Sequence, residues 1–236
     1  MKIEKLDILA FGAHPDDVEL GCSGTLYSLY LQGKKVGIID FTKGELGTRG
    51  TEETRKIEAD NAKNILQIEI RENLGFPDGF FENTKAYQLK IIEKIRMYKP
   101  EIVLCNAVLD RHPDHGKASK LVSDSCFLSG LKKIETQYNA WRPKHIFHYI
   151  QWENLKPDFC IDISHTIDKK VESCLAYKTQ FYDENSSEQE TPITSKNFLE
   201  SIKYRAQDLG RLVGVDYAEG FTTEKYPTFI NFDGFI

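Results

Sequence analysis

The feature that most constrains the fold is an alternation of short apolar runs with amphipathic stretches through the first half of the chain. It predicts, in chain order, strand 6–11, helix 23–32, strand 36–41, helix 51–66, strand 68–74, helix 85–98, strand 101–106 and helix 114–128. Repeated strand–helix units of this kind form a parallel sheet with helices on both faces. We therefore expect an α/β fold built on a doubly wound, mainly parallel sheet.

The second half of the chain is less regular. It predicts strands at 145–150 and 159–163, helices at 167–181 and 196–212, and a polar loop at 183–190. A chain of 236 residues suits one domain. We expect a single domain over 1–236, in which 131–236 elaborates a core formed by 1–130. Because loops on rigid scaffolds often carry specificity, the 183–190 loop is a candidate border of the site.

Composition narrows the class of protein. The net charge of −5 offers no general attraction for nucleic acid, and fourteen Phe with eleven Tyr argue against disorder. No apolar stretch is long enough for a signal peptide or a membrane span, so we expect no membrane partner. Cysteine occurs at Cys22, Cys105, Cys126, Cys160 and Cys174, an odd number without a C-x-x-C pair. This pattern favours a cytoplasmic protein with reduced thiols.

Two polar motifs follow predicted strands. The first, at 13–19, follows the first strand and contains His14, Asp16 and Asp17. The second, at 110–115, follows the strand that ends near Asn106. In a doubly wound sheet of order 3-2-1-4-5, strands one and four are neighbours, and a crevice opens where their loops diverge. The two motifs should therefore face each other across one cleft.

The residue types in these motifs suit zinc. Zinc accepts imidazole nitrogen and carboxylate oxygen, and a catalytic site keeps three protein ligands and one open position. His14 and Asp17 are three residues apart, and His112 and His115 repeat that spacing. Four candidates exceed a three-ligand site, so the surplus groups would be free to move protons. The spacing alone leaves open which three bind.

Structural explanations exist for each motif taken separately. A His before Pro is common in turns, and paired Asp residues often cap helices. Two such motifs at adjacent strand ends favour a site instead. Nearby Gly12, Gly21 and Gly24 could suggest a phosphate-binding loop. Their spacing is not G-x-G-x-x-G, however, and the acidic residues among them would repel a pyrophosphate.

The sequence resembles a known family at these motifs. Residues 12–21 and 112–115, together with 159–164 and 217–221, are similar to the signatures of the LmbE-like (PIG-L) N-acetylglucosamine deacetylases. The similarity is closest to the bacillithiol-biosynthesis branch, which deacetylates N-acetylglucosaminyl malate. The resemblance implies a Rossmann-like fold, release of acetate from an amino-sugar conjugate, and a homo-oligomer such as a hexamer.

The resemblance also implies roles for individual residues. One Zn²⁺ per subunit would be bound by His14, Asp17 and His115. Asp16 would be the general base, and His112 a second catalytic residue with Asp114 as its orienting partner. Iron, manganese or cobalt could occupy the same ligands.

Two arginines are candidates for substrate binding. Arg111 precedes His112 at the rim of the expected cleft, and Arg55 lies in the helix after the glycine-rich loop 42–47. A guanidinium binds carboxylates in a bidentate manner, and malate carries two carboxylates. The alternative is that both form surface ion pairs. The remaining histidines, which we expect to be structural, are His145, His148 and His165.

Two competing functions remain open. The chain could be a sister deacetylase that acts on a chitin disaccharide, a mycothiol-type precursor or an aminoglycoside intermediate. It could instead be a non-catalytic module that binds a small ligand in the crevice. Asp16 argues against the second alternative, because binding alone needs no base beside a metal.

Overall fold

One sheet of seven strands organises the computed structural model, which describes residues 4–184 and 187–228. The strands lie in the order β3-β2-β1-β4-β5-β7-β6. Their bounds are β1 Ile8–Gly12, β2 Val36–Asp40, β3 Ile70–Asn73, β4 Ile102–Asn106, β5 His145–Tyr149, β6 Phe159–Asp162 and β7 Ala218–Thr223. Strands β1 to β5 pair in parallel, and β7 runs antiparallel to both β5 and β6. The expected doubly wound order 3-2-1-4-5 is confirmed.

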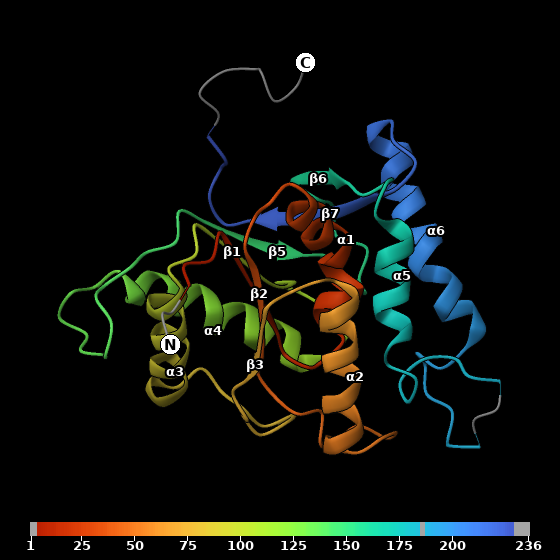
Figure 1. Ribbon diagram of the computed structural model, residues 1–236, viewed down its shortest axis with the longest axis horizontal. Helices are drawn as coiled ribbons and strands as arrows, with labels where there is room; N and C mark the ends of the chain where they lie inside the picture. The colour runs from red at the N-terminus through yellow and green to blue at the C-terminus, as the bar shows by residue number, and fades with distance from the viewer. Residues whose placement is uncertain (1–3, 185–186, 229–236) are drawn as a thin grey trace.

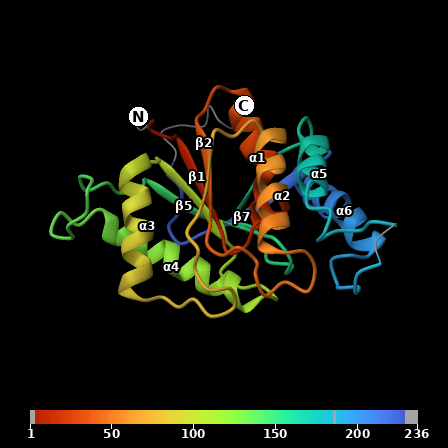
Figure 2. The same cartoon turned by 60° about the horizontal axis from the view of Figure 1, so that its bottom comes forward.

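Helices cover both faces of this sheet. Their bounds are α1 Asp17–Leu31, α2 Glu52–Ile65, α3 Lys85–Tyr98, α4 Pro113–Ser129, α5 Ile167–Leu175 and α6 Lys196–Val213. Helices α3 and α4 lie on one face and α1 and α2 on the other, with α5 and α6 side by side beyond them (Figure 1, Figure 2). This arrangement confirms the α/β class that the alternation predicts.

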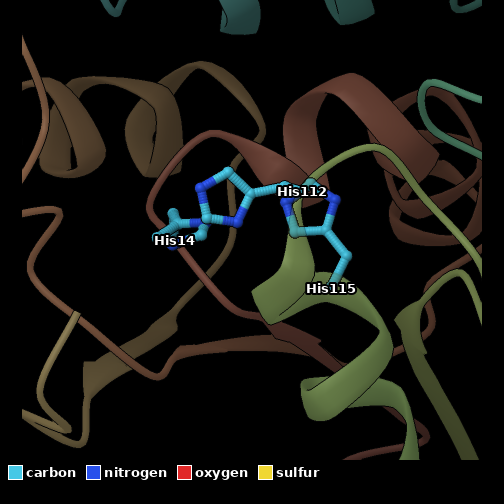
Figure 3. Close-up of side chains that lie close together, drawn as sticks. All are labelled: His14, His112 and His115. Carbon is cyan, nitrogen blue, oxygen red and sulfur yellow. The ribbon is translucent and has the colours of Figure 1, made fainter. Parts of the chain in front are cut away.

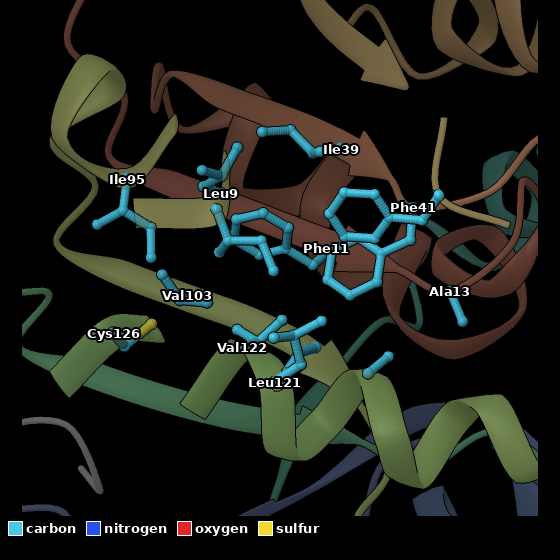
Figure 4. Packing of buried hydrophobic residues seen from close by; sticks show 14 of the residues in the cluster. Leu9, Phe11, Ala13, Ile39, Phe41, Ile95, Val103, Leu121, Val122 and Cys126 are labelled. Carbon is cyan, nitrogen blue, oxygen red and sulfur yellow. The ribbon is translucent and has the colours of Figure 1, made fainter. Parts of the chain in front are cut away.

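The core follows from the alternation of side chains along the central strands. Leu9, Phe11 and Val103 point toward α3 and α4, where Leu121 and Val122 pack against them (Figure 4). The intervening residues of β1 point the other way and join a second buried cluster with α1. Apolar burial on both faces explains why these strands read as continuous apolar runs.

Helix α1 begins six residues earlier than expected. The sequence predicts a helix from Ser23, whereas α1 starts at Asp17. The backbone at Cys22 departs from helical geometry, with φ −148° and ψ 15°, so the predicted start falls just after a kink. Before the kink, Gly21 packs against the Tyr149 ring, which a Cβ would approach to 2.1 Å. The first turns of α1 pack closely against Tyr149. Their residues therefore do not follow the amphipathic pattern from which a helix is predicted.

Strand β7 has no counterpart among the predicted strands. Its sequence places Glu219 and Gly220 in the middle of the strand, which hides the usual apolar pattern. Glu219 is buried, and its carboxylate accepts hydrogen bonds from the backbone of Gly24 and Thr25 and from Lys170. The strand is thus fixed by a buried polar contact that a local sequence pattern does not reveal.

A buried ion network joins the sheet to α1. The Arg71 guanidinium contacts Asp40 through Nε at 2.8 Å and Nη2 at 3.0 Å, and it also contacts the Glu19 carboxylate. All three side chains are almost fully buried. Burying charges is tolerable only when each one has a partner.

Replacing Arg71 with leucine is therefore expected to lower the free energy of unfolding by about 3–5 kcal/mol, because two buried carboxylates lose their partner. Urea denaturation measures this change. The matched control is Arg211→Leu, which removes an exposed ion pair with Asp208 and should cost less than about 1 kcal/mol. Equal stability of the two variants would contradict the assignment.

Candidate metal centre

The two polar motifs meet at the carboxyl edge of the sheet. Because β1 and β4 are adjacent, the loop after β1 brings His14 next to the N-terminal end of α4, which carries His112 and His115 (Figure 3). The ring centroid of His14 lies 4.6 Å from that of His112 and 5.6 Å from that of His115. All three line a cavity of about 480 Å³, as do Asp16 and Asp17. The juxtaposition expected from strand order is therefore observed.

Asp17 lies between two of these histidines. Its Oδ1 is 3.1 Å from His115 Nε2, and its Oδ2 is 3.5 Å from His14 Nδ1. The carboxylate also accepts hydrogen bonds from the side-chain amides of Asn106 and Gln151 and from the backbone of His14. Burial would raise the pKa of Asp17, but the charge and hydrogen bond of His115 hold it well below the usual range. Asp17 is thus a fixed anion facing both rings.

Each of these histidines also directs its other nitrogen at a carboxylate. His14 Nε2 lies 3.0 Å from Asp78 and 3.4 Å from Asp114, and His115 Nδ1 lies 3.4 Å from Asp110. Metal-binding histidines usually have such partners, which fix the ring and the tautomer. The sequence interpretation did not single out Asp78 or Asp110. Asp110 is the first residue of the second motif, and Asp78 follows β3 at the same edge of the sheet; these positions are the signals that could have pointed to them.

His112 differs from its two neighbours. It occupies the position before α4, where its Nδ1 accepts a hydrogen bond from the backbone N–H of Asp114 at 3.3 Å. Burial lowers the pKa of His112, and the charges of His14 and His115 lower it further. Asp114 contacts the His112 ring through its backbone N–H, and its role as the orienting partner stays a prediction. Its carboxylate lies beside His14 and accepts hydrogen bonds from the Gly79 backbone and from Lys117.

Asp16 has an unusual backbone. It stands at the N-cap position of α1 with φ 110° and ψ −23°, and its side chain makes no capping hydrogen bond. A non-glycine residue in the left-handed region costs about 1–3 kcal/mol and is typical of functional sites. The carboxylate instead pairs with Arg55 Nη1 at 3.1 Å. Burial raises the pKa of Asp16 to about 6, although Arg55 opposes the shift.

The two candidate arginines lie differently. Arg55 is only 5% exposed, and its Nη2 donates a hydrogen bond to the Pro15 carbonyl in addition to the ion pair with Asp16. Its guanidinium therefore holds the Asp16 carboxylate in a buried pair, which is not the surface ion pair that the sequence offered as the alternative. Arg55 also lines the cavity, and its substrate-binding role stays a prediction. Arg111 is exposed at the cavity and lies 4.4 Å over the Trp152 ring.

The donor set fits a divalent cation. Burial alone would lower the pKa of both His14 and His115, but the surrounding carboxylates raise the first well above its usual value and the second to about 9. The carboxylates therefore favour positive charge between these rings, which a metal ion would supply in place of ring protons. In the part of the chain that the structure describes, two groups offer ligand atoms within 4.8 Å of one another: His14, His112 and His115, and His14, Asp78 and Asp114.

Other expectations can be compared with the fold. His148 is buried and contacts Ser119 Oγ at 2.8 Å, while His145 and His165 do not line the cavity. Of the 183–190 loop, 185–186 lie outside the described residues, and the rest does not line the cavity, whereas the nearby Gln180 and Ile193 do.

All five cysteines are free. Among the described residues, no helix is long and apolar enough to cross a membrane.

Comparison with known proteins adds to this geometry. The chain is similar to the conserved protein TT1542 of Thermus thermophilus, with 36% identity, a TM-score of 0.87, and coverage of 97% of this chain and 99% of that one. It is 27% identical to the diacetylchitobiose deacetylase of Thermococcus kodakarensis over 225 residues, which are 90% of this chain and 81% of the relative. The 4-carboxy-2-hydroxymuconate hydratase of Pseudomonas putida shares the fold, with 19% identity, a TM-score of 0.77, and coverage of 97% and 98%.

A family model covers the half of the chain that carries both motifs. It matches residues 9–126 and is described as PIG-L: GlcNAc-PI de-N-acetylase. The match begins within β1 and ends within α4, so it includes the whole of the candidate centre except the residues contributed by the C-terminal half. The chain therefore belongs to the PIG-L family of de-N-acetylases.

Proposed function

We propose that the chain is a zinc-dependent hydrolase that removes the acetyl group from the nitrogen of an N-acetylglucosamine conjugate. The observation that carries this proposal is the position of Asp16, a buried carboxylate in the same cavity as His14, Asp17 and His115. A metal centre that only binds a ligand has no need of a carboxylate held out of its capping position.

The proposed ligands are His14, Asp17 and His115, because the Asp17 carboxylate lies against a ring nitrogen of each histidine. Zinc at such a site supplies Lewis acidity, which polarises a carbonyl and lowers the pKa of water. His112 offers a nitrogen close to those of His14 and His115. Its Nδ1 already accepts the Asp114 N–H, so Nε2 is the nitrogen that we assign to the substrate.

The remaining steps fall to residues of the chain. Arg55 holds Oδ2 of Asp16, and no donor within the described part of the chain contacts Oδ1. Oδ1 is therefore the atom that accepts the proton of the attacking water. Since His112 Nδ1 accepts a backbone N–H, the neutral ring carries its proton on Nε2. From there it donates a hydrogen bond to the oxygen that becomes negative as the carbonyl is attacked.

The proposed substrate is N-acetylglucosaminyl malate, which would yield glucosaminyl malate and acetate. The exposed Arg111 guanidinium at the cavity supports an anionic substituent. Diacetylchitobiose is the second candidate, because a deacetylase named for that substrate is 27% identical over 90% of the chain. The cytoplasmic location and the homo-oligomeric state remain predictions.

Acetate release from a panel of substrates tests the proposal. With zinc present, N-acetylglucosaminyl malate should be hydrolysed with a kcat/KM about tenfold or more above that of diacetylchitobiose or plain N-acetylglucosamine, because one added charged contact contributes this much. A higher kcat/KM for diacetylchitobiose would identify that disaccharide, and not the malate conjugate, as the substrate. Hydration of 4-carboxy-2-hydroxymuconate without any acetate release would overturn the deacetylase assignment.

A further inference from the structure

The cationic side chains that line the cavity differ in whether they have partners. They are Arg55, Arg111, Lys170 and Arg205. Arg55 is paired with Asp16, and Lys170 with Glu219 at 2.7 Å. Across residues 4–184 and 187–228, the guanidinium groups of Arg111 and Arg205 make no hydrogen bond or ion pair. The cavity therefore presents two positive groups without anionic partners.

Arg205 is the less accessible of the two. It lies on α6 and is half-buried, and burial lowers the pKa of its guanidinium. The acidic groups nearest to it electrostatically are Asp110 and Glu153. Asp110 is already engaged by the backbone N–H groups of Arg111 and Trp152. A half-buried guanidinium without a protein acceptor must form its hydrogen bonds with water or with a ligand, and an anionic ligand is the stronger partner.

A second hollow of about 240 Å³ adjoins the cavity at Arg205. Four residues line both spaces: Trp152, Phe198, Ser201 and Arg205. The Trp152 and Phe198 rings stack with centroids 5.3 Å apart, and Arg111 lies over the same indole. The shared wall thus has an aromatic platform with one guanidinium over it and another beside it.

We propose that Arg205 is a specificity-determining residue, and that with Arg111 it binds carboxylates of the group attached to the amino sugar, which occupies the hollow beside α6. This inference rests on the proposed function, since the acetyl group must lie at the metal centre while the attached group extends toward α6. A neutral sugar in the hollow would leave Arg205 desolvated and unpaired, so the site favours anionic conjugates.

The test compares two substrates that differ in charge but hardly in shape: N-acetylglucosaminyl malate and its uncharged diamide. Arg205→Gln should raise KM for the malate conjugate about 10–100-fold, the usual loss of a charged hydrogen bond, and should change KM for the diamide far less. Arg205→Lys, which keeps the charge but not the bidentate geometry, should fall between wild type and Arg205→Gln. Arg211→Gln, an exposed position on the same helix, is the matched control and should match wild type.

Calorimetric binding of glucosaminyl malate, the proposed product, separates the two proposals because it requires no turnover. If glucosaminyl malate binds more weakly to Arg205→Gln than to wild type, the subsite is supported. A wild-type protein that releases no acetate would overturn only the proposed function. An equal rise in KM for both substrates would overturn the role of Arg205. So would product binding that is unchanged in the variant, or absent in wild type.

Discussion

Replacing Asp16 with asparagine is expected to lower kcat by about 10²–10⁴-fold while metal binding is retained. Asparagine tolerates the left-handed backbone at this position, and its amide oxygen can still accept the hydrogen bond from Arg55. It cannot, however, take a proton from water. Acetate release together with metal content, measured on the same preparations, tests both parts of this expectation.

The control for this variant is Asp168→Asn, which removes an exposed carboxylate in the first turn of α5 and should leave kcat unchanged. A near-normal kcat for Asp16→Asn would show that another group accepts the proton. Loss of metal from Asp16→Asn would instead place Asp16 among the ligands, and the proposed division between base and ligands would be wrong.

The fold was predictable where local patterns and global packing agree. Strands β1, β2 and β4 are buried on both faces, so their apolar runs are unambiguous, and helix α3 begins and ends at the predicted residues, Lys85 and Tyr98. Strand β7 and the start of α1 were missed because their sequences serve contacts with distant elements. Glu219 joins β7 to α1 and α5, and Gly21 admits the Tyr149 ring.

The candidate site was predictable to the extent that it lies in continuous motifs. Residues that complete it from elsewhere, such as Asp78 and Gln151, stand in loops with no distinctive spacing. Arg55 and Arg205 show the limit most clearly. Both are arginines on amphipathic helices. Only the tertiary structure shows that the first is held by Asp16 and that the second lines the cavity with no hydrogen-bond or ion-pair partner among the described residues.

Replacing His115 with alanine is expected to remove the metal and, with it, the activity. The ring lies against Asp17 through Nε2 and against Asp110 through Nδ1, so its loss removes one proposed ligand and leaves the Asp17 anion without its main counter-charge. Metal content should fall from about one ion per chain to background. Asp110→Asn, which leaves the ligand but weakens its orientation, should lower metal affinity by only about 10–100-fold.

His115→Ala removes a proposed ligand, whereas Asp110→Asn alters only a partner of that ligand, so the order of their metal affinities is the test. Metal titration of wild type, Asp110→Asn and His115→Ala should give decreasing affinity in that sequence, and His165→Ala, at an exposed histidine away from the cavity, should match wild type. If His115→Ala bound metal as tightly as wild type, the ion would have to be held by the neighbouring group of His14, Asp78 and Asp114. In that arrangement His14 would use Nε2, the nitrogen that faces those carboxylates. Asp17 would then not be a ligand, and the proposed assignment of Asp16 as the base beside the ligands His14, Asp17 and His115 would be wrong.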